Sequence, residues 1–171
     1  MPVETLIASA CLALFVGLVL FAALSDIATM TIPNWVSIAA VVLFPLAATL
    51  AGLTPAQIGL HLGVGVVMFF IGFLLFNIGI LGGGDVKVIA AVSVWTGLGA
   101  LSSFAFAMTL AGGGLALLII IARRAAKPSD AAPAFVNRLL KPQNGIPYAV
   151  AIAIGVIASL PLQPVFKALG A

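Results

Sequence analysis

The sequence predicts an all-α membrane protein, with six transmembrane helices in one bundle that forms a single domain over residues 1–171. Hydrophobic residues make up 64% of the chain and charged residues only 6%, far from the composition of a soluble globular domain. Several uncharged runs approach the roughly 20 residues that a helix needs to cross the hydrocarbon core. They lack the alternation of a transmembrane barrel, so we expect helices in contact with a lipid bilayer.

The first expected helix covers residues 6–24. Glu4 precedes this run, where a secretory signal peptide would carry basic residues, and no small-residue cleavage site ends it. We therefore expect a helix that is retained in the protein. The run contains Cys11, the one cysteine of the sequence, so a disulfide framework and a cysteine metal cluster are excluded.

Five further helices are expected along the rest of the chain, each bounded by turn residues such as Pro, Asn and Gly. They cover residues 36–53, 58–80, 86–96, 101–122 and 148–165. The stretch 85–123 leaves two alternatives, because it barely accommodates two spans and a turn. It forms either two short spans joined at 97–99, or one long span with a re-entrant piece.

Basic residues indicate how the chain is oriented in the membrane. Five of the seven lie in the loop at residues 123–147, against the single acid Asp130. By the positive-inside rule this loop is cytoplasmic, and the expected location is the inner (plasma) membrane. Counting back through six helices places residues 25–34 and 79–87 on the same face. The net charge of +3 has no accompanying aromatic pattern, so we expect no nucleic-acid partner.

Two of the four acidic residues are candidates for chemistry. Asp26 directly follows the first expected span, and Asp85 directly precedes the fourth. Ionisable groups at membrane depth are costly and are functional candidates for that reason. Two carboxyl groups that share one proton can take a proton from water while donating another to a peptide carbonyl. The pair therefore predicts an aspartyl protease, provided that both residues reach the same face.

Other interpretations of the two acids remain open at this point. Asp85 also fits the N-cap of a helix, and Asp26 also fits a residue that simply ends one. Paired carboxylates form relays in proton-coupled transporters, although relay acids usually lie near mid-span. The third possibility is a structural subunit of a secretion system, with both acids as caps.

A glycine triplet, Gly82 to Gly84, directly precedes Asp85. Because glycine lacks a side chain and readily takes positive φ, the triplet would let a substrate strand approach the carboxylate. The alternative is a tight turn between two helices. A second triplet at residues 112–114 has no neighbouring acid, and we expect it to serve close helix packing.

Two segments resemble the signature regions of a known family, the type IV prepilin peptidases, which are GxGD-type membrane aspartyl proteases. The first segment is Leu24-Ser25-Asp26-Ile27 with Thr31-Ile32-Pro33-Asn34-Trp35, and the second is Gly82-Gly83-Gly84-Asp85-Val86-Lys87-Val88-Ile89-Ala90-Ala91. The resemblance implies that Asp26 and Asp85 are the catalytic pair. Site-shaping or substrate-binding roles are expected for Gly82, Gly83, Gly84, Lys87 and Asn34. Lys87 would face away from Asp85 on a regular helix, and it is either a charge partner of that carboxylate or a side chain that extends to the membrane interface.

The resemblance also implies a substrate. Members of this family act at the cytoplasmic face and remove a short, often basic leader from prepilin or pseudopilin precursors, just before a hydrophobic helix and commonly after a glycine. Longer members also methylate the new amino terminus and carry Cys-x-x-Cys motifs. This chain has one cysteine and begins at its first helix, so it resembles the short form of Flp or Tad-type pili, without expected methyltransferase activity. We expect no cofactor and no metal, and no oligomeric state is predicted.

Overall fold

The computed structural model describes residues 2–170, and these form a helical bundle that confirms the predicted fold class. The elements are α1 (Val3–Thr29), α2 (Asn34–Leu50), α3 (Pro55–Asn77), α4 (Gly83–Ala125), α5 (Ala134–Leu140), α6 (Ala149–Ser159), the 3₁₀ turn η1 (Leu160–Leu162) and α7 (Pro164–Ala168). Four helical stretches of the described chain have the length and composition of a membrane span, and α2 is a shorter apolar helix. The predicted count of six spans is therefore not exactly confirmed.

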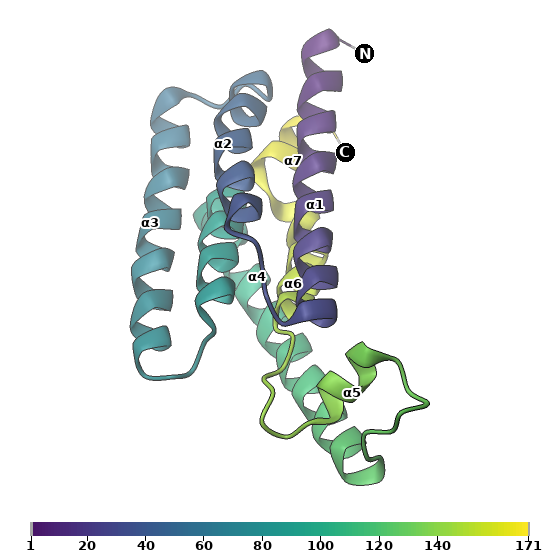
Figure 1. The fold of residues 1–171 in the computed structure, drawn as a ribbon. Coiled ribbons are helices and arrows are strands. Elements are labelled where there is room, and N and C mark those ends of the chain that lie inside the picture. The colour runs from purple at the N-terminus through teal and green to yellow at the C-terminus, as the bar shows by residue number, and fades with distance from the viewer. Residues whose placement is uncertain (1, 171) are drawn as a thin grey trace.

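The long element α4 combines the predicted helices at 86–96 and 101–122. It is interrupted at Gly97, whose backbone is non-helical, with φ 52° and ψ −171°. A side chain at this position would collide with the ring of His61, whose Nδ1 lies 2.7 Å from the carbonyl oxygen of Val94. In Figure 1 the part of α4 before Gly97 rises next to α3, and the part after it runs back toward the opposite end. Of the two alternatives predicted for residues 85–123, the structure therefore has two helical segments joined by a turn.

The last predicted helix, at residues 148–165, is also interrupted. α6 ends at Ser159 and is followed by η1 and the short α7. Pro161 and Pro164 lie in this break, and proline cannot donate the backbone hydrogen bond that continues a helix. The predicted loop at 123–147 contains α5, and Arg123 anchors it by donating to the carbonyl oxygens of Leu139 and Asn144, both at 2.8 Å.

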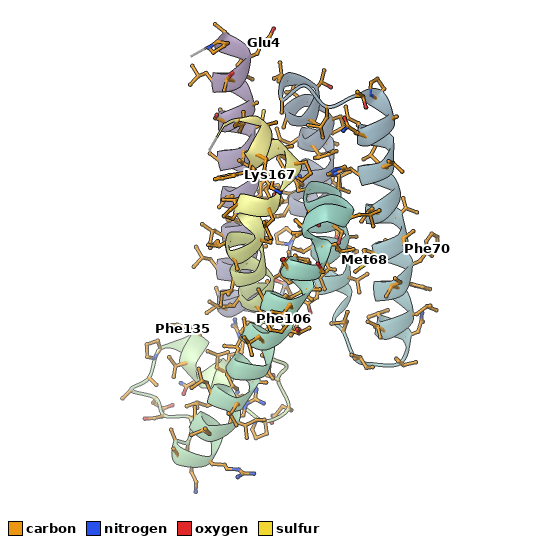
Figure 2. The ribbon with its side chains drawn as sticks, turned by 180° about the vertical axis from the view of Figure 1, so that it is seen from behind. Glu4, Met68, Phe70, Phe106, Phe135 and Lys167 are labelled. Carbon is orange, nitrogen blue, oxygen red and sulfur yellow. The ribbon has the colours of Figure 1, made fainter. Side chains whose placement is uncertain are left out.

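Trp95 lies at the centre of the core and joins three helices. Its side chain is fully buried and stacks on Phe15 of α1, with ring centroids 4.2 Å apart. Its Nε1 donates to the carbonyl oxygen of Ala40 in α2 at 2.8 Å. The outer surface is also apolar: Phe70 and Phe106, both labelled in Figure 2, are 61% and 71% exposed. A bundle that is apolar on both its inner and outer faces is a multi-pass membrane protein.

One end of the bundle gathers the segments that carry the candidate residues. Figure 1 shows the end of α1, the connection between α3 and α4, and the α5 loop at the lower end. Both chain ends lie toward the opposite, upper end. This alternation of helix direction brings the two sequence-distant aspartates to one end of the bundle.

Candidate active site

Asp26 lies inside the last turn of α1. The helix continues to Thr29, beyond its predicted end at residue 24, and closes at Met30, which adopts the left-handed conformation with φ 55°. The side chain of Asp26 is only 7% exposed. Its Oδ2 accepts a hydrogen bond of 3.1 Å from the backbone N–H of Ala149, the first residue of α6. Asp26 therefore supplies an acceptor for an amide that has no partner within its own helix.

Asp85 is the third residue of α4 and not its N-cap. The N-cap is Gly82, whose backbone is extended at φ −74° and ψ 146°. A Cβ atom placed on Gly82 would lie 2.8 Å from Oδ2 of Asp85. The half-buried carboxyl of Asp85 thus packs against the bare backbone of Gly82, and the N-cap interpretation is wrong.

The Gly82 to Gly84 triplet does not use the positive φ that glycine readily takes. Among the described glycines, the positive values belong to Gly52, Gly79, Gly97 and Gly170. Gly83 and Gly84 already belong to the first turn of α4. The physical reason for glycine at position 82 is steric, because the neighbouring carboxylate fills the space of a side chain.

Asp26 and Asp85 line the same cavity, of about 290 Å³. Asp26 reaches this cavity from the end of α1 and Asp85 from the start of α4. The remaining lining residues come from the connection between α1 and α2, from the start of α2, and from the N-cap and first turns of α4: Met30, Thr31, Ile32, Asn34, Gly82, Gly83, Gly84 and Lys87. The cavity therefore contains every residue that the sequence predicted for the site, together with Met30, Thr31 and Ile32.

Side-chain hydrogen bonds fix the chain between α1 and α2 beside the cavity. The hydroxyl of Ser25 donates to the carbonyl oxygen of Thr31 at 2.8 Å, and that of Thr29 donates to the carbonyl oxygen of Ser25, also at 2.8 Å. The hydroxyls of Thr29 and Thr31 are 2.6 Å apart. Such local bonds replace the helix ladder where the chain turns. Thr31 and Ile32 belong to the first signature segment, so this part of the lining was visible in the sequence.

Lys87 and Asn34 connect two helices at the edge of the cavity. Nζ of Lys87 donates to Oδ1 of Asn34 at 2.8 Å, which ties the start of α4 to the start of α2. Lys87 is exposed and lines the aspartate cavity, as does Asn34. The hydrogen-bond partner of Lys87 is the amide oxygen of Asn34 and not a carboxylate. This bond holds the wall of the cavity in place.

Tyr148 is a residue near the site that sequence reasoning missed. It forms the N-cap of α6, immediately before Ala149, whose backbone amide donates a hydrogen bond to Asp26. Its ring lies over Gly112, where an added Cβ would be 2.8 Å from the tyrosine hydroxyl. Burial raises the pKa of Tyr148, and the nearby charge of Asp85 raises it further, so its hydroxyl stays protonated at neutral pH. The one available signal was that this is the chain's single tyrosine, placed directly before an apolar run.

The site offers two carboxyl groups that can act on a water molecule. Within residues 2–170, no group of three or more His, Cys, Asp or Glu side chains is placed to hold a metal ion. Two close carboxyl groups that share a proton can act as general base and general acid in turn.

Comparison with known proteins gives one family. The model of the type IV leader peptidase family matches residues 13–117, which is more than half of the chain and includes both aspartates. The search of curated proteins and the search of solved structures each found no match.

Proposed function

The chain belongs to the type IV leader peptidase family, and from this membership we propose that it cleaves leader peptides from prepilin-type precursors with Asp26 and Asp85 as its catalytic pair. The family makes the chain a membrane protease. The observation that carries the assignment of the pair is the shared cavity, which both carboxyl groups line although they come from α1 and α4.

In the proposed mechanism, one carboxylate takes a proton from a water molecule as that water attacks the peptide carbonyl carbon. The other carboxyl group donates its proton to the carbonyl oxygen, which gives a tetrahedral intermediate. When the intermediate collapses, the C–N bond breaks and the leaving amine takes the proton that the base had received. The other aspartate, by then a carboxylate, takes a proton from one of the two hydroxyls, which leaves a carboxylic acid and restores the shared proton of the pair. The protons belong to the pair, so neither aspartate has a fixed role as acid or base.

The site would face the cytoplasm. Five of the seven basic residues lie in the segment 123–147. This segment lies at the same end of the bundle as the end of α1, which carries Asp26, and the start of α4, which carries Asp85. The positive-inside rule then supports a catalytic face on the cytoplasmic side of the inner membrane. The placement of both acids at helix ends, and not near mid-span, favours proteolysis over a proton relay across the membrane.

We further propose that the substrate is a precursor of the Flp type, because the sequence has one cysteine and none of the Cys-x-x-Cys motifs of the longer members. The proposal is confined to cleavage and does not include methylation of the new amino terminus.

Cleavage of a precursor by the detergent-solubilised protein tests this function. The precursor carries a basic leader before its apolar helix, and its shortening is followed by mobility on a gel. We expect Asp26→Asn and Asp85→Asn to insert normally but not to cleave. Asp130→Asn is the matched control, because Asp130 is exposed in the loop. Full cleavage by either site variant would remove that residue from the mechanism.

A further inference from the structure

A second cavity, of about 590 Å³, opens between α2 and α3 and has α4 as its floor. Asn34 and Lys87 line both this α2–α3 groove and the aspartate cavity, so the two spaces adjoin at the Lys87–Asn34 hydrogen bond. We propose that the groove holds the apolar helix of the precursor that follows the scissile bond. This inference rests on the proposed function and names where the substrate binds.

The shape of the groove fits a helix. Each of its three walls presents residues at helical spacing: Ser37 and Val41 on α2, Leu62 and Val66 on α3, and Ala90 and Val94 on α4. On α2 the lining extends from residue 34 to residue 42, which is about 12 Å along a helix axis. Small residues allow helix backbones to approach closely in a membrane. A groove of this length accommodates roughly two turns of a substrate helix.

An unpartnered polar atom indicates that the occupant has polar groups of its own. Ser37 is 8% exposed, and its Oγ is buried without a hydrogen-bond partner. It lies one helical turn beyond Asn34, at the part of the groove nearest the aspartates. The first amides of a helix have no partners within that helix, and lipid cannot satisfy them. Because this oxygen has almost no exposed surface, the Ser37 side chain has to turn toward the groove before an occupant reaches it. Its hydroxyl can then accept from such an amide, whereas the acyl chain of a lipid offers it nothing.

The direction of the groove agrees with the order of the substrate. α2 begins at Asn34 beside the aspartate cavity and leads away from it. A precursor whose leader reaches the aspartates would enter the groove with the amino-terminal end of its helix next to Ser37. The scissile bond would then lie at the boundary between the polar cavity and the apolar groove.

Two synthetic peptides test the proposal. The long peptide has a basic leader, a glycine before the cut and roughly 20 apolar residues after it; the short peptide ends about six residues after the cut. Val66 lines the groove and is 56% exposed, so Val66→Trp fills the groove without disturbing the core. Val67→Trp is the control, because Val67 is 58% exposed on the same helix and lies outside the groove lining.

We expect Val66→Trp to lower kcat/KM for the long peptide about tenfold relative to the short peptide, and Val67→Trp to leave this ratio unchanged. An unchanged ratio in Val66→Trp would overturn the proposal. Cleavage of the long peptide by the unaltered protein tests the protease function by itself, so the two failures are distinguishable.

A binding measurement complements the kinetics and does not depend on cleavage. A photo-crosslinking residue at position 38, which is 62% exposed and lines the groove, is introduced together with Asp85→Asn into protein in lipid vesicles. The expected product is an adduct with the apolar part of the long peptide. Adducts with lipid alone would show that lipid fills the groove and would refute the proposal.

Discussion

The carboxylate of Asp26 accepts a hydrogen bond from the backbone amide of Ala149, a residue 123 positions away in the sequence. This bond joins the end of α1 to the start of α6. It fixes one proposed catalytic group against an element that the signature segments do not include. Asp26 therefore has a structural role and a chemical role that can be tested separately. An uncharged hydrogen-bond acceptor at this position can keep the bond to Ala149, but it cannot take up and release a proton as a carboxyl group does.

Asp26→Asn and Asp26→Ala should differ in stability and agree in activity. The amide oxygen of asparagine can still accept from Ala149, whereas alanine leaves the amide at the start of α6 without a partner. Losing such a cap costs about 1 kcal/mol. We expect Asp26→Ala to unfold more readily in a thermal or denaturant titration, Asp26→Asn to resemble the unaltered protein, and both to be inactive. Equal stability of the two variants would show that the bond contributes nothing.

Gly82→Ala should impair the site without unfolding the protein. A Cβ at this position would lie 2.8 Å from Oδ2 of Asp85, so the carboxyl would have to move. Displacement of a reacting group by a fraction of an ångström to an ångström is expected to lower kcat/KM by roughly tenfold or more. Gly99→Ala is the control, because an added Cβ there meets no atom within 4 Å. Unaltered cleavage by Gly82→Ala would contradict the described position of Asp85.

Gly112 should matter where its neighbour Gly113 does not. An alanine at 112 would press on the ring of Tyr148. Tyr148 directly precedes Ala149, whose backbone amide donates a hydrogen bond to Asp26. An alanine at 113 meets no atom within 4 Å. We expect Gly112→Ala to lose thermal stability and cleavage activity together, and Gly113→Ala to keep both. If the two variants behaved alike, Tyr148 would have no part in positioning Asp26.

Asn34 and Lys87 should act as one unit. Asn34→Ala and Lys87→Met each break the same 2.8 Å hydrogen bond, so the double variant should be no worse than either single one. The expected coupling is about 1 kcal/mol, or roughly fivefold in kcat/KM. The double-mutant cycle is measured with the long and the short peptide. Purely additive effects would mean that the two residues act separately.

Membrane orientation is measurable with single cysteines in a Cys11→Ala background. Ser129 lies in the exposed basic loop, and Glu4 lies near the opposite end of the bundle, away from Phe135 of α5 in Figure 2. We expect an impermeant maleimide to label Glu4→Cys in spheroplasts with an intact inner membrane, and Ser129→Cys only after that membrane is opened. The reverse pattern would place the site on the outer face.

The sequence predicted the parts of the fold that depend on local pattern. Apolar runs revealed the helices because the membrane requires length and hydrophobicity, and the turn at 97–99 is confirmed at Gly97. The ends were less predictable. Residues 25–29 are partly polar and yet continue α1. The backbone hydrogen bonds of the helix continue as far as the N–H of Met30, and they do not require apolar side chains.

The site was predictable in its residues but not in its contacts. The motif segments identified both aspartates, Asn34 and Lys87 as site candidates, and all four line one cavity. Three contacts could not be predicted, because each depends on packing between helices that are distant in sequence. They are the bond from the Ala149 amide to Asp26, the position of the Tyr148 ring on Gly112, and the lack of a partner for the Ser37 hydroxyl.

The most direct test of the central claim is a single-turnover measurement of precursor cleavage with Asp26→Asn, Asp85→Asn and the variant that carries both changes. Groups that act jointly on one water molecule are lost together, so each single variant should fall to the background rate and the double variant no lower. A single variant that cleaves at a rate close to that of the unaltered protein, or two partial losses that multiply in the double variant, would contradict joint action of the two aspartates.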